Sequence, residues 1–203
     1  MSRQAVLSLL ATAIVVMLLV SGWRPFDRAT WWMEVAPVLI ALPLLAATRH
    51  RFPLTPLLYA LIFVHATILI AGGAYTYARV PLGFWMQEAL ALDRNPYDKI
   101  GHFAQGLVPM LVAREVLLRR GYVTGKRIAG FLSICFAMAV SAWYELIEWG
   151  AALAMGQGAD EFLGTQGDVW DTQSDMFMAF LGALTAYLLL APLHDRQLRA
   201  MAR

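Results

Sequence analysis

Six apolar segments of the chain are long enough, or nearly long enough, to cross a lipid bilayer, and this restricts the fold more than any other feature. Crossing the hydrocarbon core takes about 20 mostly apolar residues, and the backbone there must be helical to satisfy its hydrogen bonds. The expected spans are Ala5–Gly22, Met33–Thr48, Leu57–Tyr77, Ile100–Leu118, Ile128–Met155 and Val169–Leu193.

Three further features complete the predicted fold. The second span is short and contains Pro37 and Pro43, so it is the least regular of the six. Between the third and fourth spans, Leu82–Leu92 mixes aromatic and acidic residues and predicts a short helix on the membrane surface. The first span resembles a signal peptide but has no clear cleavage site, and more spans follow it. We therefore predict an all-α, polytopic membrane helix bundle in which residues 1–203 form one integral domain.

The composition agrees with a membrane class and excludes some functions. Hydrophobic residues make up 60% of the chain and charged residues 15%, whereas a soluble domain carries about a quarter charged residues. A net charge of +2 is too small to imply a nucleic-acid partner. The single Cys135 excludes an internal disulfide.

The basic residues predict the orientation. Loops on the cytoplasmic side of a membrane are enriched in Lys and Arg. With both termini in the cytoplasm, 11 of the 16 basic residues fall on the inner side, and the loop before the last span has none. His50 and His194 then lie among cytoplasmic charges and are expected to face solvent or lipid. Asp98, His102 and the acids of the last two spans are expected at the outer, periplasmic face.

An acidic stretch is the strongest functional signal. Seven of the 14 acids lie between residues 145 and 175, and no Lys or Arg occurs from Ile128 to Asp195, so nearby sequence offers them no basic partner. An ionisable group at membrane depth costs several kcal/mol unless it is paired, solvated or bound to a cation. The acids are Glu145, Glu148, Asp160, Glu161, Asp168, Asp171 and Asp175.

Carboxylates with one or two imidazoles are typical ligands of Mg, Mn, Fe or Zn, so we predict a divalent metal site of unknown identity. The predicted ligands are His65, His102, Glu145, Glu148, Asp168, Asp171 and Asp175. Alternatively, these acids cap helix ends and face water, which suits Asp168 best. Asp175 and Glu145 lie too deep in their spans for capping to explain them.

The predicted metal site also includes supporting residues. Asp98 and Gln105 share a helix face with His102 and are predicted to orient its ring. His102 or Glu148 is predicted to act as general base. The alternative for His102 is a solvated interfacial histidine, and for His65 a hydrogen bond between helices.

Three motifs resemble the bacterial YjdF-like inner membrane proteins, a family of unknown function. They are residues 94–106 (RNPYDKIGHFAQG), 144–149 (YELIEW) and 164–173 (GTQGDVWDTQ). The resemblance covers about residues 57–190 and implies an inner-membrane location and the place of the site, but no reaction.

A more distant resemblance is to VanZ-like proteins, whose namesake is linked to glycopeptide-antibiotic resistance. Asp98-Lys99-x-x-His102, a later Glu145 or Glu148, and Asp168-x-x-Asp171 match their pattern. Asp175 stands where that family has Asn, and Thr165 where it usually has Arg. The added negative charge favours a cation site in this chain.

Three functions remain open from the sequence. The first is a metal-dependent hydrolase or transferase that acts on a phospholipid headgroup or a polyprenyl-linked envelope precursor. The second is a non-catalytic factor that binds a lipid or antibiotic headgroup. The third is a small ion transporter, which the absence of an evident inverted repeat and the one-sided charge pattern disfavour.

Overall fold

A computed structural model describes residues 2–155 and 165–202, and its regular elements in these ranges are helices. By internal contacts the chain divides into two compact units. The first comprises Met1–Leu54 and Tyr59–Asp98, and the second comprises Thr55–Leu58 and Lys99–Arg203. Asp160 and Glu161 lie outside the described residues. The single integral domain stays a prediction.

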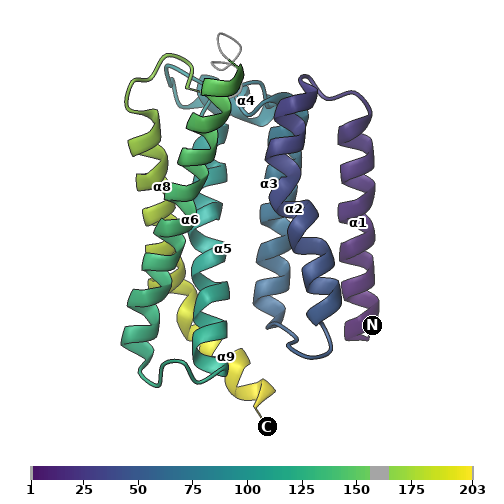
Figure 1. Ribbon diagram of the computed structural model, residues 1–203, viewed down its shortest axis with the longest axis vertical. Coiled ribbons are helices and arrows are strands. Elements are labelled where there is room, and N and C mark those ends of the chain that lie inside the picture. Colours follow the sequence, from purple (N-terminus) through teal and green to yellow (C-terminus); the bar gives the residue numbers. More distant parts are fainter. Residues whose placement is uncertain (1, 156–164, 203) are drawn as a thin grey trace. The chain divides into compact units, whose positions relative to one another are not determined.

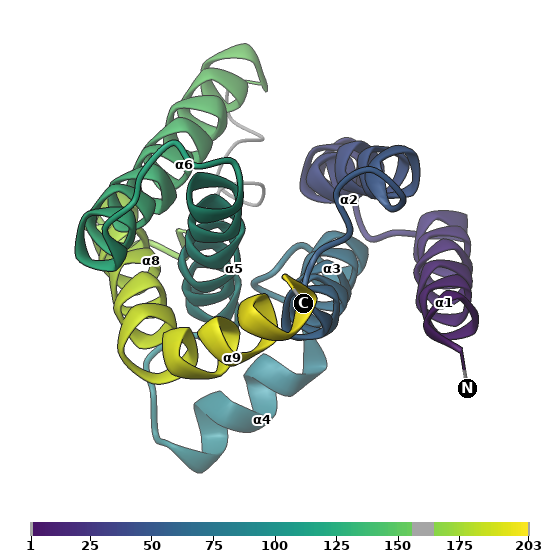
Figure 2. The same ribbon diagram turned by 90° about the horizontal axis from the view of Figure 1, so that it is seen from below.

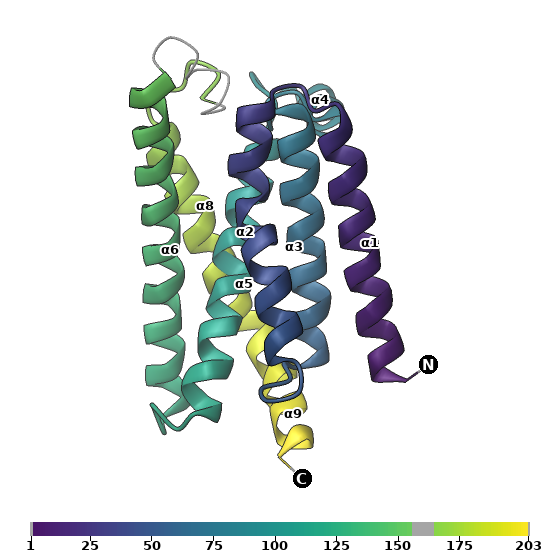
Figure 3. The ribbon, with the colours of Figure 1, turned by 45° about the vertical axis from the view of Figure 1, so that its right-hand side comes forward.

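The first unit contains α1 (Arg3–Trp23), α2 (Arg28–Thr48), most of α3 (Pro56–Tyr75) and α4 (Pro81–Ala89), shown in Figures 1 and 3. Helix α2 begins at Arg28 rather than at the predicted Met33, because the Asp27 carboxylate accepts a hydrogen bond of 2.7 Å from the Thr30 N–H. This bond satisfies a donor that the first turn leaves without a helical acceptor. Pro37 and Pro43 both lie inside the helix.

The end of α3 and the start of α4 are set by local backbone geometry. Helix α3 ends at Tyr75, two residues before the predicted end, because Thr76 and Tyr77 adopt positive φ angles of 55° and 31°. Helix α4 begins with Pro81, a residue suited to the first turn because its missing N–H would have no helical partner there. It is the short helix predicted at Leu82–Leu92.

The second unit contains α5 (Tyr97–Arg119, except its first two residues), α6 (Lys126–Met155), α8 (Asp171–Thr185), the π-helical turn η2 (Ala186–Leu190) and α9 (Ala191–Met201), seen end-on in Figure 2. Small side chains line its helix contacts. Every fourth residue of α6 is buried over Ala129, Ser133, Ala137, Ser141 and Glu145. Such residues let membrane helices approach closely.

The last span is one residue out of regular helical register. Ala179, Ala183 and Ala186 are fully buried, and the next buried positions are Ala191 and His194. The step from 186 to 191 is five residues, since the π turn inserts one extra residue into the helix. As a result, α9 turns His194 toward the interior.

Five described helices are long and apolar enough to cross a membrane: α1, α2, α3, α6 and the continuous α8–α9. Helix α5 has 23 residues, about 35 Å at 1.5 Å per residue, but it carries charges at both ends. Apolar side chains on the spans remain exposed, for example Leu19 and Leu189, each 70% exposed. The prediction of an all-helical membrane bundle is confirmed, whereas spanning by α5 stays a prediction.

Candidate functional site

Two glycines bring α5 and α8 together near the acidic cluster. A Cβ at Gly106 would collide with the Ala179 carbonyl, and one at Gly182 would collide with the Phe103 carbonyl. Lys99 contacts Asp171 and Asp175 near the start of the two helices, and Arg114 contacts His194 and Asp195 at the other end, so α5 and the continuous α8–α9 run in the same direction. Their N-terminal ends, which carry Lys99 and Asp171, therefore lie at the same end of the unit.

Lys99 supplies the acids with a basic partner from another helix. Its Nζ donates to Asp171 Oδ1 at 2.9 Å, Ser174 Oγ at 2.7 Å and Asp175 Oδ1 at 2.6 Å. The side chain of Asp175 is 2% exposed and that of Lys99 is 19% exposed. Nearby sequence offers Asp171 and Asp175 no basic partner, and the tertiary structure supplies one from a distant segment.

His102 lies between two further carboxylates. Its Nδ1 is 3.7 Å from Glu145 Oε1, and its Nε2 is 3.9 Å from Asp175 Oδ1. These separations exceed hydrogen-bond length. Gln105 Oε1 contacts Nδ1 at 3.2 Å, and the edge of the ring meets Tyr144 with centroids 6.3 Å apart. His102 is 4% exposed, so it is a buried residue and not a solvated one.

We call Lys99, His102, Glu145, Asp171 and Asp175 the outer cluster, after the membrane face predicted for it. The cluster brings three acids, one Lys and one His together in a largely buried group. Acids at such depth need to be paired, solvated or bound to a cation, so a bound cation would suit this cluster.

The donor types and spacings also suit a divalent ion. Two atoms bound at 2.0–2.2 Å to one ion lie at most about 4.4 Å apart, and His102 Nε2 and Asp175 Oδ1 fall within this limit at 3.9 Å. Asp98 lies one helical turn before His102 on α5, and the ligand atoms of Asp98, His102 and Asp175 lie within 4.8 Å of one another, so they would have to close by a few tenths of an ångström to bind one such ion. However, Lys99 already contacts Asp175 Oδ1, so an ion would have to use the other oxygen or displace the ammonium group.

The remaining predicted site residues are not all placed in this cluster. Asp168 is half-exposed and accepts a local hydrogen bond of 2.9 Å from the Trp170 N–H, just before α8 begins. Glu148 is half-buried on α6, one turn beyond Glu145. His65 is half-buried on α3 in the first unit. Their membership of a metal site stays a prediction.

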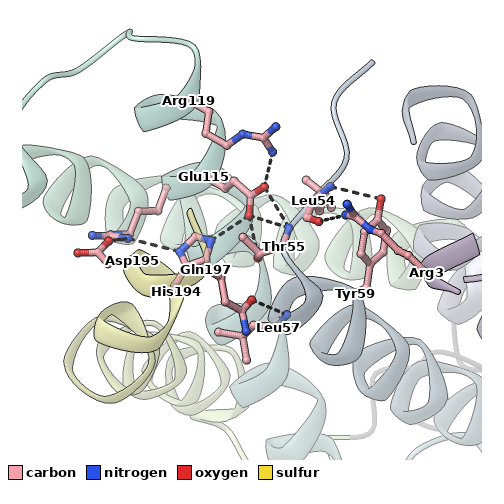
Figure 4. Close-up of polar contacts among 11 residues, drawn as sticks. Arg3, Leu54, Thr55, Leu57, Tyr59, Glu115, Arg119, His194, Asp195 and Gln197 are labelled. Carbon is pink, nitrogen blue, oxygen red and sulfur yellow. Dashed lines mark hydrogen bonds and ion pairs between the residues drawn. The ribbon is translucent and has the colours of Figure 1, made fainter. Parts of the chain in front are cut away.

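A second buried ionic group, at the other end of α5, was missed from the sequence. Glu115 and His194 are fully buried, with Glu115 Oε2 2.9 Å from His194 Nε2 (Figure 4). Glu115 also accepts hydrogen bonds from the Thr55 backbone N–H, the Thr55 hydroxyl and Arg119. The prediction that His194 faces solvent or lipid is wrong, because it counted cytoplasmic charges and could not foresee the π turn.

Arg114 also belongs to this second buried ionic group. It is 2% exposed, contacts His194 Nδ1 at 3.4 Å and pairs with Asp195 at 2.8 Å, and Asp195 also pairs with Lys126. Two adjacent charged residues, Arg114 and Glu115, within an apolar segment were the sequence signal that could have indicated this group. Charged groups are thus buried at both ends of α5. The inference that such groups lie on one side only, which argued against transport, is therefore wrong.

The apolar helices and buried charges define an integral membrane protein of the helical-bundle class. The chain belongs to DUF2238, a family described as predicted membrane proteins, whose model matches residues 6–196. It is 62% identical over 197 residues to the inner membrane protein YjdF of Escherichia coli strain K12, covering 97% of this chain and 94% of that protein. No solved structure matches the chain significantly.

These comparisons confirm the YjdF-like resemblance and a multi-pass inner membrane protein. The VanZ-like resemblance stays an interpretation of the sequence motifs. The cytoplasmic termini and the outward-facing site stay predictions.

Proposed function

We propose that the protein is a membrane-embedded, metal-dependent enzyme that acts on a lipid phosphate at the outer cluster. The substrate would be a phospholipid headgroup or a polyprenyl-linked envelope precursor. The observation that carries the proposal is the buried placement of His102 between Glu145 and Asp175.

The position and charge of each residue indicate the role it would have. His102 and Asp175, with Asp98 or Glu145, would hold a divalent ion, which when bound activates water and stabilises charge on a phosphate. Lys99 donates to Asp171, Ser174 and Asp175, so its ammonium group would exchange one of these three hydrogen bonds for a phosphate oxygen. Gln105 fixes the His102 ring through the 3.2 Å contact. His102, if not a ligand, or Glu148 would accept the proton of the attacking water.

Metal content measured together with activity tests this proposal. The protein would be purified without chelators and analysed by elemental mass spectrometry, then assayed for phosphate or headgroup release from phospholipid vesicles and from undecaprenyl diphosphate. Asp175→Asn should remove the metal and the activity, because the amide keeps the shape but loses the charge. Glu88→Gln, an exposed acid on α4, is the matched control. A metal-free wild type that is still active would refute the metal role.

A second function is favoured by the Lys99 contacts themselves. Because the ammonium group already lies between Asp171 and Asp175, the cluster can persist as a structural ion pair without a metal. The protein would then be a non-catalytic factor that binds a lipid or antibiotic headgroup. Headgroup binding with neither bound metal nor turnover, and with binding lost in Asp175→Asn, would support this alternative over the enzyme.

A further inference from the structure

The first unit contains a cavity of about 360 Å³ between α1, α2 and α3. This volume lies in the range of small-molecule sites, about 300–1,000 Å³. Along α1 its lining runs from Gln4 to Ile14, which is roughly 15 Å at 1.5 Å per residue. That length is about half of the 30 Å hydrocarbon core, or the depth of one leaflet.

Contacts at both ends attach α1 to the rest of the first unit. Toward the end of α1, Trp31 packs against Gly22, and its indole N–H donates to Ser21 Oγ at 3.0 Å. At the start of α1, Arg3 donates to the Leu54 carbonyl at 2.6 Å and lies over the Tyr59 ring. Between these ties α1 buries little, since Ile14 and Leu18 are its buried residues. The helix that lines the cavity is therefore fixed near both of its ends.

The lining is apolar in depth and polar at one end. Ile14, Leu42 and Phe63 lie among the apolar lining residues, whereas Gln4 and Arg49 line the end near the N-terminus. Arg49 is exposed, and one of its N–H groups donates to the Ala46 carbonyl, so further guanidinium donors can reach a ligand. An apolar channel one leaflet deep, with an arginine at its polar end, matches an acyl chain joined to a phosphate.

We propose that this groove binds one acyl chain of an anionic glycerophospholipid, with Arg49 contacting the lipid phosphate. The lipid comes from the leaflet on the side of the N-terminus. The positive-inside pattern assigns that side to the cytoplasm, where anionic lipids attract basic segments. The site is separate from the outer cluster, so it does not depend on the proposed enzyme.

Native mass spectrometry of the delipidated full-length protein tests the proposal, with dioleoyl phosphatidylglycerol or dioleoyl phosphatidylcholine added. Wild type should retain one phosphatidylglycerol in preference to phosphatidylcholine. Ala11→Phe fills the groove and should weaken phosphatidylglycerol binding at least tenfold. Arg49→Gln should weaken it about fivefold, since one basic residue near the surface is worth roughly 1 kcal/mol.

Arg51→Gln is the matched control, because Arg51 is exposed near the same end but does not line the groove. It should bind phosphatidylglycerol as wild type does. Equal losses in the Arg49 and Arg51 variants would overturn the proposal, as would equal binding of both lipids or unchanged binding in a folded Ala11→Phe protein. Circular dichroism and size-exclusion profiles establish folding, and Ala46→Leu provides a second groove-filling variant if Ala11→Phe does not fold.

Discussion

The crossing of α5 and α8 at Gly106 predicts a large loss of stability for a very small substitution. In Gly106→Ala, the new methyl group would overlap the Ala179 carbonyl, which belongs to helix backbone and cannot rotate away. Overpacking costs about 1–3 kcal/mol, and a rigid obstacle favours the upper part of that range. Ala is more favourable than Gly inside a helix by about 0.5–1 kcal/mol. The net expectation is a loss of about 2 kcal/mol in the free energy of unfolding.

Gly150→Ala is the matched control for this substitution. Gly150 also lies within a helix, α6, but a Cβ there meets no atom within 4 Å. It should therefore raise stability by about 0.5–1 kcal/mol through helix propensity alone. The two variants should differ by roughly 3 kcal/mol.

Reversible unfolding in mixed detergent micelles, followed by far-ultraviolet circular dichroism, measures both variants on one scale. Gly182→Ala should behave like Gly106→Ala, because its Cβ would meet the Phe103 carbonyl. Equal stability of the Gly106 and Gly150 variants would show that α5 and α8 do not cross at these glycines.

Three further substitutions test the polar contacts. Lys99→Met leaves two buried acids without this Lys and should lower the free energy of unfolding by about 3–5 kcal/mol. Adding Asp175→Asn should restore part of that free energy, and no recovery in the double variant would contradict the pairing of Lys99 with Asp175. Asp27→Ala should cost about 1 kcal/mol at pH 7. The hydrogen bond from the Thr30 N–H lowers the pKa of Asp27, so this stabilisation is present above the unfolded-state pKa and lost as the pH falls through the folded-state value. The melting curves of wild type and Asp27→Ala should therefore converge below pH 3.8, and convergence already at pH 6 would refute the role of Asp27 as the cap of α2. Glu115→Ala should lower the free energy of unfolding by about 3–5 kcal/mol, because the donors that bond to Glu115 would stay buried without an acceptor. Glu88→Ala, at an exposed acid, should change it by no more than about 0.5 kcal/mol. Equal effects of the two variants in unfolding assays would refute the network around Glu115.

The helical elements were largely predictable because hydrophobic length is a local property. The first, third and fifth spans matched their predicted ranges to within about two residues. Helix α2 was predicted to begin at Met33, five residues too late, because its first turn depends on the cap that Asp27 provides and not on apolar length. The last span contains a π turn, a feature without a clear sequence signal, and continues as α9 to Met201, beyond its predicted end at Leu193.

The candidate site was predictable in part for a different physical reason. Acids buried in membrane helices need partners, so the positions of Glu145 and Asp175 within apolar segments are enough to indicate a site. Which partner each acid meets depends on helix packing, and Lys99 is more than 70 positions from both Asp171 and Asp175.

The sequence by itself determined that the chain forms membrane helices, since apolar length and helical spacing are properties of each segment taken alone. Only the tertiary structure decided how the charges pair, because close packing at two glycines places α5 against α8, where Lys99 meets Asp175. At the other end of α5, the π turn rotates His194 onto Glu115. Such pairing depends on the relative rotation of helices, a quantity that a single segment does not encode.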